Sequence, residues 1–309
     1  MLDVRRMRVL REVGVRGSFS AAAEALNFTQ SAVSQHIAAL EREASTQLVD
    51  RGSRGVRLTE AGRVLVDHAD AILARIECAE DDLAAIAGLR GGRLRLLSFQ
   101  SAGATLLPRA VAAFHERHPR VELSMIEGEP DQAAVRLRSG DADLALVYDH
   151  ELTPGLLPPE LELTDLIDDP YEIIIPKGHA LAGRRRLSLA DFADEHWIAS
   201  SNLDGCRRIT DGVCRAAGFE PRVAFELDET LAAQALVAAG VGITLLPRLA
   251  LATLHPGVVS RPLSDAPTRH VLAARLENGY GSPASEAMVQ ILVDVAEEFK
   301  GARLELAAS

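Results

Sequence analysis

The sequence predicts three parts: a small all-α N-terminal domain, one long connecting helix and a larger C-terminal α/β domain. In residues 3–42, apolar side chains recur at helical spacing over several short segments, which are followed by two short strands around a glycine turn. The same helical spacing then continues without a break over residues 59–89. From residue 93 onward, apolar strands alternate with amphipathic helices, which is typical of a sheet with helices on both faces.

The spacing of apolar residues in the N-terminal segment predicts a helix-turn-helix. A first helix covers residues 3–15, and Ser18 or Ser20 then supplies the N-cap of a short second helix. Small alanines in that helix allow close packing against its neighbour, as a helix-turn-helix requires. Residues 27–29 form the turn before a third helix, whose inward positions are Val33, Ile37 and Leu40.

The outward face of the third helix is the candidate DNA-binding surface. Short hydroxyl and amide side chains can approach base edges without repelling phosphates, and they are Thr29, Gln30, Ser31, Ser34 and Gln35. An ordinary helical hairpin with a polar solvent face explains the periodicity equally well. The next segment favours DNA binding, because a basic hairpin after such a helix is the wing of a winged helix. Its arginines are Arg51, Arg54 and Arg57.

The charge distribution agrees with a nucleic-acid partner for the N-terminal domain alone. The whole chain of 309 residues carries a net charge of −11, which argues against such a partner. Residues 1–66, however, hold ten Arg against seven acids, so they carry +3 and leave −14 for the rest. A basic N-terminal domain on an acidic body suits a chain whose first part touches an anion.

The long helix is predicted to pair with a second subunit. Thr59 is a suitable N-cap, and the apolar or small positions approximate a heptad seam: Ala61, Leu65, His68, Ile72, Ile76, Ala79, Leu83 and Ile86. A seam on a helix this long needs a partner, most simply residues 59–87 of another copy. The alternative is an amphipathic helix packed on its own domain. Glycines at 88–92 end the helix and form a hinge.

In the C-terminal domain we expect strands at 93–99, 121–128, 141–148, 171–176, 196–201, 222–227 and 242–247. Helices are expected at 106–119, 131–140, from Ser188, and at 205–218, 228–240 and 282–299. Ligands of such sheets sit beyond the carboxyl ends of the strands. We find no nucleophile elbow, no HExxH motif and no cofactor loop, so neither an enzyme nor a metal or other cofactor is predicted.

No apolar run reaches the roughly 18–20 residues that a membrane helix needs. Charges are threaded through the first residues, unlike a signal peptide. We therefore expect a cytoplasmic protein without a membrane partner.

Two segments, SFSAAAEALNFTQSAVSQHIAALE and DRGSRGVRLTEAG, resemble the N-terminal signature of the LysR-type transcriptional regulators. The resemblance implies a winged helix-turn-helix domain at 1–58, a linker helix at 59–90 that joins a homodimer or homotetramer, and an effector-binding domain at 91–302. That domain is expected to have two α/β lobes, as in periplasmic binding proteins. Lobe one covers 93–163 and 269–301, and lobe two covers 164–268.

By this resemblance the chain is a sequence-specific regulator that binds a double-stranded DNA operator and senses a small-molecule effector between its lobes. Expected effector contacts are polar residues at strand ends: Ser98, Gln100, Ser101, Gly128, Tyr148, Ser200, Ser201, Asn202 and Thr230. Ser98 and Ser201, on opposite lobes, are the pair expected to sense closure. Such residues also commonly cap helices and turns, and a purely structural body is an alternative.

The kind of effector is left open by the sequence. Hydroxyls and helix N-termini suit a carboxylate, whereas the acids Glu127, Glu129 and Asp149 suit an amine. A thiol-based redox sensor using Cys206 is the alternative within the family. Against it, Cys206 and Cys214 lie eight residues apart on one expected helix, about 12 Å along its axis, which is beyond disulfide reach.

Overall fold

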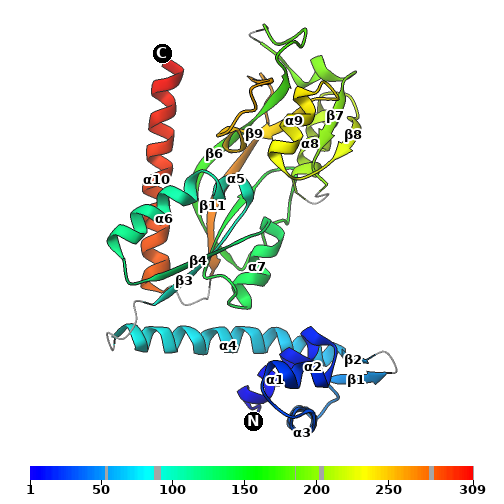
Figure 1. Ribbon diagram of the computed structural model, residues 1–309, viewed down its shortest axis with the longest axis vertical. Helices are drawn as coiled ribbons and strands as arrows, with labels where there is room; N and C mark the ends of the chain where they lie inside the picture. Colours follow the sequence, from blue (N-terminus) through cyan, green and yellow to red (C-terminus); the bar gives the residue numbers. More distant parts are fainter. Residues whose placement is uncertain (53–54, 87–91, 185, 202–204, 278–281, 309) are drawn as a thin grey trace. The chain divides into compact units, whose positions relative to one another are not determined.

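The computed structural model describes residues 1–309 except for 53–54, 87–91, 185, 202–204, 278–281 and 309 (Figure 1). Contacts divide the chain into two compact units, one of residues 1–90 and 135–141 and one of residues 91–134 and 142–309. We call the elements up to α4 the head and the elements from β3 onward the body.

Three helices form the head around one apolar core: α1 (Val4–Arg16), α2 (Phe19–Ala25) and α3 (Gln30–Ala44). Each begins at a polar cap, because the side chains of Asp3, Ser18 and Thr29 accept hydrogen bonds from backbone N–H groups of the first turn. The core includes Leu10, Val13, Ala22, Val33, Ile37 and Leu40, all inaccessible to solvent. The predicted inward face of α3 is therefore confirmed.

Two polar residues adopt left-handed backbone at the ends of the head helices. Asn27, in the turn between α2 and α3, has φ 54°, and Ser45, directly after α3, has φ 53°. Asn tolerates this conformation, whereas most side chains carry a steric cost of about 1–2 kcal/mol in it. Ser45 therefore occupies a position where glycine is the favoured residue.

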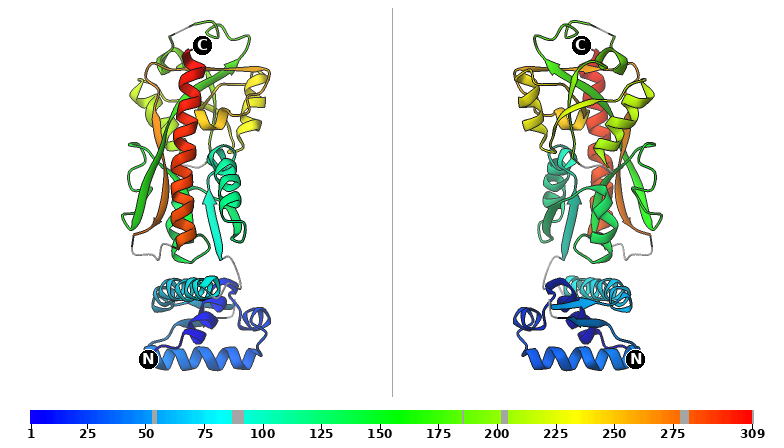
Figure 2. Two further views of the ribbon diagram at one scale, coloured as in Figure 1. Left: turned by 90° about the vertical axis from the view of Figure 1, so that its left-hand side faces the viewer. Right: turned by 90° about the vertical axis from the view of Figure 1, so that its right-hand side faces the viewer.

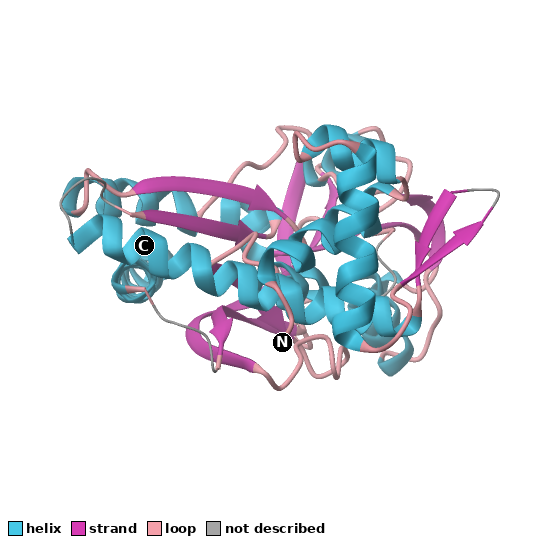
Figure 3. Ribbon diagram, turned by 90° about the horizontal axis from the view of Figure 1, so that it is seen from below, coloured by secondary structure: helices cyan, strands magenta, loops and turns pink. Residues whose placement is uncertain are grey.

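The wing is a two-stranded hairpin of β1 (Val49–Gly52) and β2 (Gly55–Leu58), paired antiparallel. It projects from the helical part of the head (Figures 1 and 3). Its base is held to α3 by the Glu41 carboxylate, which accepts from the N–H groups of Leu48 at 2.9 Å and Val49 at 3.3 Å. The hairpin predicted from the glycine turn is confirmed.

The helix α4 (Glu60–Ile86) begins as predicted after Thr59, whose hydroxyl accepts from the Gly62 N–H at 3.0 Å. One expectation for its seam needs correction: Leu65 is buried in the core of its own head, because the first turns of α4 pack on α1. Further along, Ile72, Ile76 and Leu83 are exposed by 37%, 40% and 66%. The predicted seam positions that are exposed therefore begin at Ile72, near the middle of α4; Val64, off the predicted seam, is exposed as well.

The first lobe of the body is a mixed sheet. Its strands run in the order β4 (Glu122–Glu127), β3 (Arg93–Ser98), β5 (Leu144–Asp149), β11 (Thr268–Leu276) and β6 (Leu161–Pro176). The first three are parallel, and β11 pairs antiparallel with both its neighbours. Helices α6 (Leu106–Arg117) and α10 (Pro283–Ala308) pack against each other beside this sheet (Figure 2). The chain also forms α5 (Gln100–Gly103) and α7 (Pro130–Arg138) here.

The second lobe is built on the far half of β6. There β6 pairs with β9 (Thr244–Pro247) and β10 (Val258–Pro262), while β7 (His196–Ala199) pairs in parallel with β8 (Arg222–Glu226). Helices α8 (Cys206–Ala216) and α9 (Thr230–Ala238) belong to this lobe. The body thus has the expected two α/β lobes, and the expected boundary at 163/164 falls inside the continuous strand β6.

Several local expectations differ from the structure. The helix expected from Ser188 is a single 3₁₀ turn, η1 (Leu189–Phe192), capped by Ser188 and Asp191. The strand β11 and the first ten residues of β6 were not expected, because polar and charged residues interrupt their apolar pattern. The strand β10 was not expected either, because its short sequence VVSRP ends in a proline and shows little alternation. A second 3₁₀ turn, η2 (Arg248–Leu251), follows β9. Within the described ranges, no helix has both the length and the apolar character needed to cross a membrane.

Replacing Ser45 by Gly should stabilise the head by about 1 kcal/mol, because glycine adopts left-handed backbone without the steric cost of a side chain. The same change at the exposed Ser20, inside α2, should destabilise it by about 0.5 kcal/mol. The single tryptophan, Trp197, lies in the body, so hydrogen exchange of head peptides is the suitable measurement. Slower exchange in Ser45→Gly and faster exchange in Ser20→Gly are expected; a change of the same sign in both would refute the argument.

Candidate functional site

The outward face of α3 presents the side chains that the sequence singled out. Gln30, Ser31 and Gln35 are exposed and Ser34 is half-buried, and the first turn of α3 contains no acid. Thr29 has a different role, because its hydroxyl caps α3 and lies 3.0 Å from the Ser31 hydroxyl. This surface offers amide and hydroxyl groups that both donate and accept hydrogen bonds, as base edges require.

In the wing, the three arginines are described to different extents. Arg57 lies in β2 and is exposed. Arg51 lies in β1, but its side chain is outside the described residues, and so is the whole of Arg54. Arg57 is therefore the wing cation that the structure places on the surface of the head.

The body encloses a cavity of about 340 Å³ lined by both lobes. Six of the sequence-predicted effector contacts line it: Gln100, Ser101, Gly128, Tyr148, Ser200 and Thr230. Ser98 does not, since it is buried and its hydroxyl donates to the Phe99 carbonyl at 3.1 Å. Ser201 is also outside the lining, and Asn202 lies outside the described residues.

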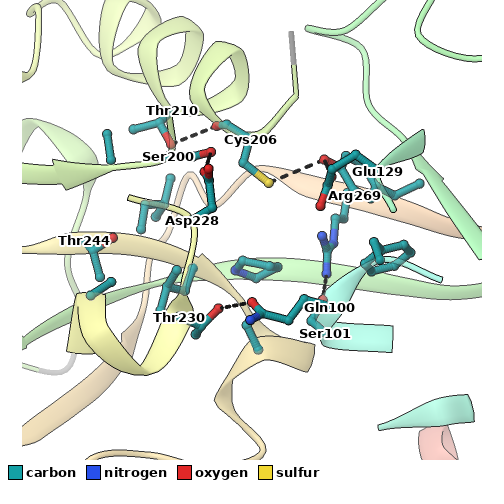
Figure 4. Close-up of a pocket in the computed structure, with 18 of the residues that line it drawn as sticks. Gln100, Ser101, Glu129, Ser200, Cys206, Thr210, Asp228, Thr230, Thr244 and Arg269 are labelled. Atoms are coloured by element: carbon teal, nitrogen blue, oxygen red, sulfur yellow. Dashed lines mark hydrogen bonds between the residues drawn. The ribbon is translucent and has the colours of Figure 1, made fainter. Parts of the chain in front are cut away.

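A hydrogen bond crosses the cavity from one lobe to the other. The Thr230 hydroxyl, at the start of α9, donates to the Gln100 side-chain oxygen, at the start of α5, over 2.9 Å (Figure 4). These residues are 130 positions apart in the sequence. Thr230 and Gln100 therefore connect the two lobes at the cavity, whereas neither Ser98 nor Ser201 lines it.

A buried ion pair forms the floor of the site. The Arg269 guanidinium donates to the Asp169 carboxylate at 2.9 and 3.0 Å and to the Ser101 hydroxyl at 2.6 Å. Both charged side chains are at most 2% exposed. The guanidinium carbon also lies 4.8 Å from the ring centres of Phe99 and Tyr148. Burial disfavours the charged guanidinium, but the negative charge of Asp169 and the nearby groups of Tyr171, Cys206 and Tyr148 together outweigh that effect, so the pKa of Arg269 is raised and the cation persists.

A short polar chain links the two lobes on one wall. The Tyr148 hydroxyl donates to the Glu129 carboxylate at 3.0 Å and lies 3.5 Å from the Cys206 sulfur. Burial raises the pKa of Glu129, although the hydrogen bond from Tyr148 and the charge of Arg269 oppose that effect. Glu129 is therefore a carboxylate that titrates above the ordinary glutamate range.

On lobe two, Asp228 holds the two residues that directly follow β7, Ser200 and Ser201. Its carboxylate accepts from the Ser200 hydroxyl at 2.6 Å (Figure 4). It also accepts from the Ser201 N–H at 2.9 Å, and the Ser201 hydroxyl donates to it as well. Asp228 lines the cavity and remains exposed. The serines that the sequence singled out are thus held in place by an acid that it did not.

The sequence reasoning missed Arg269, Asp169, Asp228 and Tyr171. Arg269 and Asp169 are direct partners across β11 and β6, yet they lie 100 positions apart in the chain. No local signal distinguished them, because β6 also carries the acids Glu162, Asp165 and Asp168, and β11 begins with the polar residues Thr268 and His270 around Arg269.

Two family models match the chain. Residues 4–63 match the model described as bacterial regulatory helix-turn-helix protein, lysR family, and residues 87–297 match the LysR substrate binding domain. The chain belongs to the LysR family. It is a LysR-type, DNA-binding transcriptional regulator with an effector-binding domain, as the resemblance implied.

Among curated relatives, this LysR-type chain is 32% identical to the probable HTH-type transcriptional regulator LrrA of Synechococcus elongatus, over 97% of the chain and 99% of LrrA. It is 30% identical to the HTH-type transcriptional regulator ShiR of Corynebacterium glutamicum, over 95% and 99%.

Two solved structures share the fold. Full-length CbnR complexed with its target DNA is 20% identical, with a TM-score of 0.67 and coverage of 95% of this chain and 100% of CbnR. The effector-binding domain of QuiR in complex with shikimate is 24% identical, with a TM-score of 0.58 and coverage of 67% and 98%.

The two described thiols of this LysR-type regulator, Cys206 and Cys214, do not have the features of a redox pair. Cys206 and Cys214 lie on the same helix, α8, and both are free. Burial raises the pKa of the Cys206 thiol, and it raises the pKa of Cys214 to about 12. Because the thiolate is the reactive species, neutral pH leaves both groups poorly reactive. Among the described residues, no group of His, Cys, Asp and Glu could hold a metal ion.

Asp169→Asn should lower the stability of the body by about 3–5 kcal/mol, because it leaves the buried Arg269 cation without its counter-charge. Adding Arg269→Met should restore part of the loss, since an apolar side chain removes the buried charge altogether. Urea unfolding followed by the fluorescence of the buried Trp197 measures both effects.

The control is Glu162→Gln, which breaks the more exposed pair with Arg275 and should change stability by less than about 1 kcal/mol. A double variant no more stable than Asp169→Asn alone would contradict the assigned role of the ion pair.

Proposed function

We propose that this LysR-type regulator binds a duplex operator as a homo-oligomer, and that a small molecule in the body cavity changes that binding. The observation that carries the proposal is the cavity itself, lined by polar groups of both lobes and crossed by the Thr230–Gln100 hydrogen bond. The shikimate bound to the effector domain of QuiR, which has the same fold, supports a small-molecule role. No catalytic step is part of the proposal.

In this proposal the head reads DNA with α3 and holds it with the wing. Gln30, Ser31, Ser34 and Gln35 face base edges, Thr29 fixes the start of the helix, and Arg51, Arg54 and Arg57 contact phosphates or the minor groove. The exposed polar face of α3 and the exposed Arg57 support this assignment. The DNA complex of CbnR supports it through the shared fold. The cytoplasm, where operator DNA is found, is the proposed location.

Subunits pair through α4 in this proposal. The exposed apolar side chains of Ile72, Ile76 and Leu83 are spaced by four and seven residues, so they lie along one side of the helix. Burying this stripe against its copy removes apolar surface from water. A dimer also fits the symmetry of operators, whose half-sites repeat with the spacing of the DNA helix.

The effector acts by binding the open and closed body with different affinity, because equal affinity would leave the equilibrium unchanged. A change in the body of each subunit alters the geometry that an oligomer presents to half-sites of fixed spacing. Since bending DNA costs energy, we expect the effector to change the bend and the footprint more than the bare affinity.

Gln35→Ala should weaken binding to the cognate operator by about 1–3 kcal/mol and relax the preference at one base position, because one amide contact to a base edge is lost. The operator can be selected from a pool of random duplexes, and competition against random DNA gives the specificity ratio. Gln290→Ala, at an exposed position of the body, is the control and should bind as wild type does. If Gln35→Ala kept the full specificity ratio, α3 would be misassigned.

Thr230→Val should loosen the contact between the lobes, because it removes one hydrogen bond worth about 0.5–1.5 kcal/mol while keeping the shape of the side chain. Hydrogen exchange at the first turns of α5 and α9 should become roughly two- to tenfold faster. Thr210→Val is the matched control, since Thr210 also lines the cavity but donates to the Cys206 carbonyl of its own helix. Equal exchange in the two variants would show that the bridge does not hold the lobes together.

A further inference from the structure

The cavity carries more negative than positive charge. Of the described residues that line it, Glu127, Glu129 and Asp228 are acids and Arg269 is the single Lys or Arg. The sequence left open whether a carboxylate or an amine binds here. The balance of charge in the folded cavity addresses that choice directly.

The one cation is already neutralised. Arg269 donates twice to Asp169 and once to Ser101, and it lies against the rings of Phe99 and Tyr148. Its side chain is only 2% exposed. A carboxylate entering the cavity would therefore meet a paired and covered guanidinium, together with three acids that repel it.

Glu129 and Asp228 are placed to attract a cationic ligand. Glu129 follows β4 on lobe one and Asp228 follows β8 on lobe two, so they belong to opposite walls. A carboxylate has about four acceptor sites. Glu129 receives the Tyr148 hydroxyl, whereas Asp228 receives three donors of Ser200 and Ser201 and so acts on a ligand mainly through its charge. Like charges on the two walls disfavour their approach as long as no cationic ligand lies between them.

A third group points to a ligand independently of the acids. Tyr171, in β6, lines the cavity and is 1% exposed. Its hydroxyl oxygen is buried and makes no hydrogen bond of good geometry among the described residues, although it interacts with the Cys206 thiol. A thiol is a weak partner, so a ligand that supplies a stronger hydrogen bond there gains affinity.

We propose that the effector is a small molecule bearing an ammonium group, bound between Glu129 of lobe one and Asp228 of lobe two. An ammonium has three donors and no acceptor, which matches two carboxylates and the Tyr171 oxygen. The carbon part of the ligand contacts the apolar wall of Ile198, Leu227 and Leu246. The inference rests on the proposed effector role of this cavity and names the chemical class that the cavity accepts.

An ammonium ligand would bind the closed body more tightly than the open body, which is the difference in affinity that a switch needs. A cation between the two walls replaces repulsion by attraction, so it binds most tightly when the lobes approach each other. A carboxylate would add to the negative charge and favour separation of the walls. An ammonium effector is therefore expected to stabilise the closed body.

The binding should also depend on pH with a defined sign. Burial raises the pKa of Glu129, and the charged or titratable groups around it are Asp131, Tyr148, Cys206, Asp228 and Arg269. An ammonium needs the ionised carboxylate, so affinity is full above the raised pKa and falls as acidification protonates Glu129. This loss should begin at a higher pH than an ordinary glutamate would give.

The test uses the full chain without DNA, because diamines also bind phosphates. Isothermal titration and thermal shift are recorded with three probes of one carbon length: the diamine putrescine, the diol butanediol and the dicarboxylate succinate. Putrescine should bind and raise the melting temperature, and the other two should not. Glu129→Gln and Asp228→Asn should each weaken putrescine by about tenfold or more. Glu162→Gln, an acid outside the cavity lining, should leave it unchanged.

The remaining outcomes overturn the inference in distinguishable ways. Binding of succinate or butanediol in preference to putrescine keeps the cavity as an effector site but refutes the ammonium class. Putrescine binding that is equal in wild type, Glu129→Gln and Asp228→Asn refutes the proposed contacts. If no probe binds and the two variants bend a selected operator as wild type does, the cavity has no effector role and the proposed function fails as well.

Discussion

The buried pair of Arg269 and Asp169 sits where β6 leaves one sheet and enters the other. Asp169 belongs to the last stretch of β6 that pairs with β11, and two residues later Tyr171 pairs with β9. A second oxygen of Asp169 accepts from the Leu249 N–H at 2.9 Å, so one carboxylate ties both crossing strands to η2. Because both charges are almost inaccessible to water, their mutual attraction is weakly screened and neither can be lost alone without a large cost.

The chemistry of the cavity follows from that arrangement. Asp169 neutralises Arg269, so the remaining acids among the described lining residues give the cavity a negative charge. The rings of Tyr148 and Phe99 cover the guanidinium. The head is organised more simply: polar caps begin the helices, alanines allow close packing, and the first turn of α3 carries no acid. The body thus depends on a buried ion pair, whereas the core of the head is apolar.

Sequence reasoning succeeded where local patterns determine structure. The inward residues of α3, the cap at Thr59 and the glycine-centred wing all follow from spacing within a few residues. It failed where distant segments meet: the period of α4 could not show that Leu65 packs in its own head, and nothing local connects Asp169 with Arg269. Ser98 was misplaced for a related reason, because a polar residue at a strand end can bond to the neighbouring carbonyl instead of facing a ligand.

The strand β6 is 16 residues long and serves both lobes without a break. Near the crossing, the register between β11 and β6 shifts at Val271/Leu272, a bulge of the kind that increases local twist. A continuous strand that keeps its ladder bonds cannot act as a loose joint, so relative motion of the lobes must be taken up as torsion spread over several residues. A ligand that brings the lobes together must therefore twist β6 itself, and a larger rotation of the lobes costs more energy than a small one.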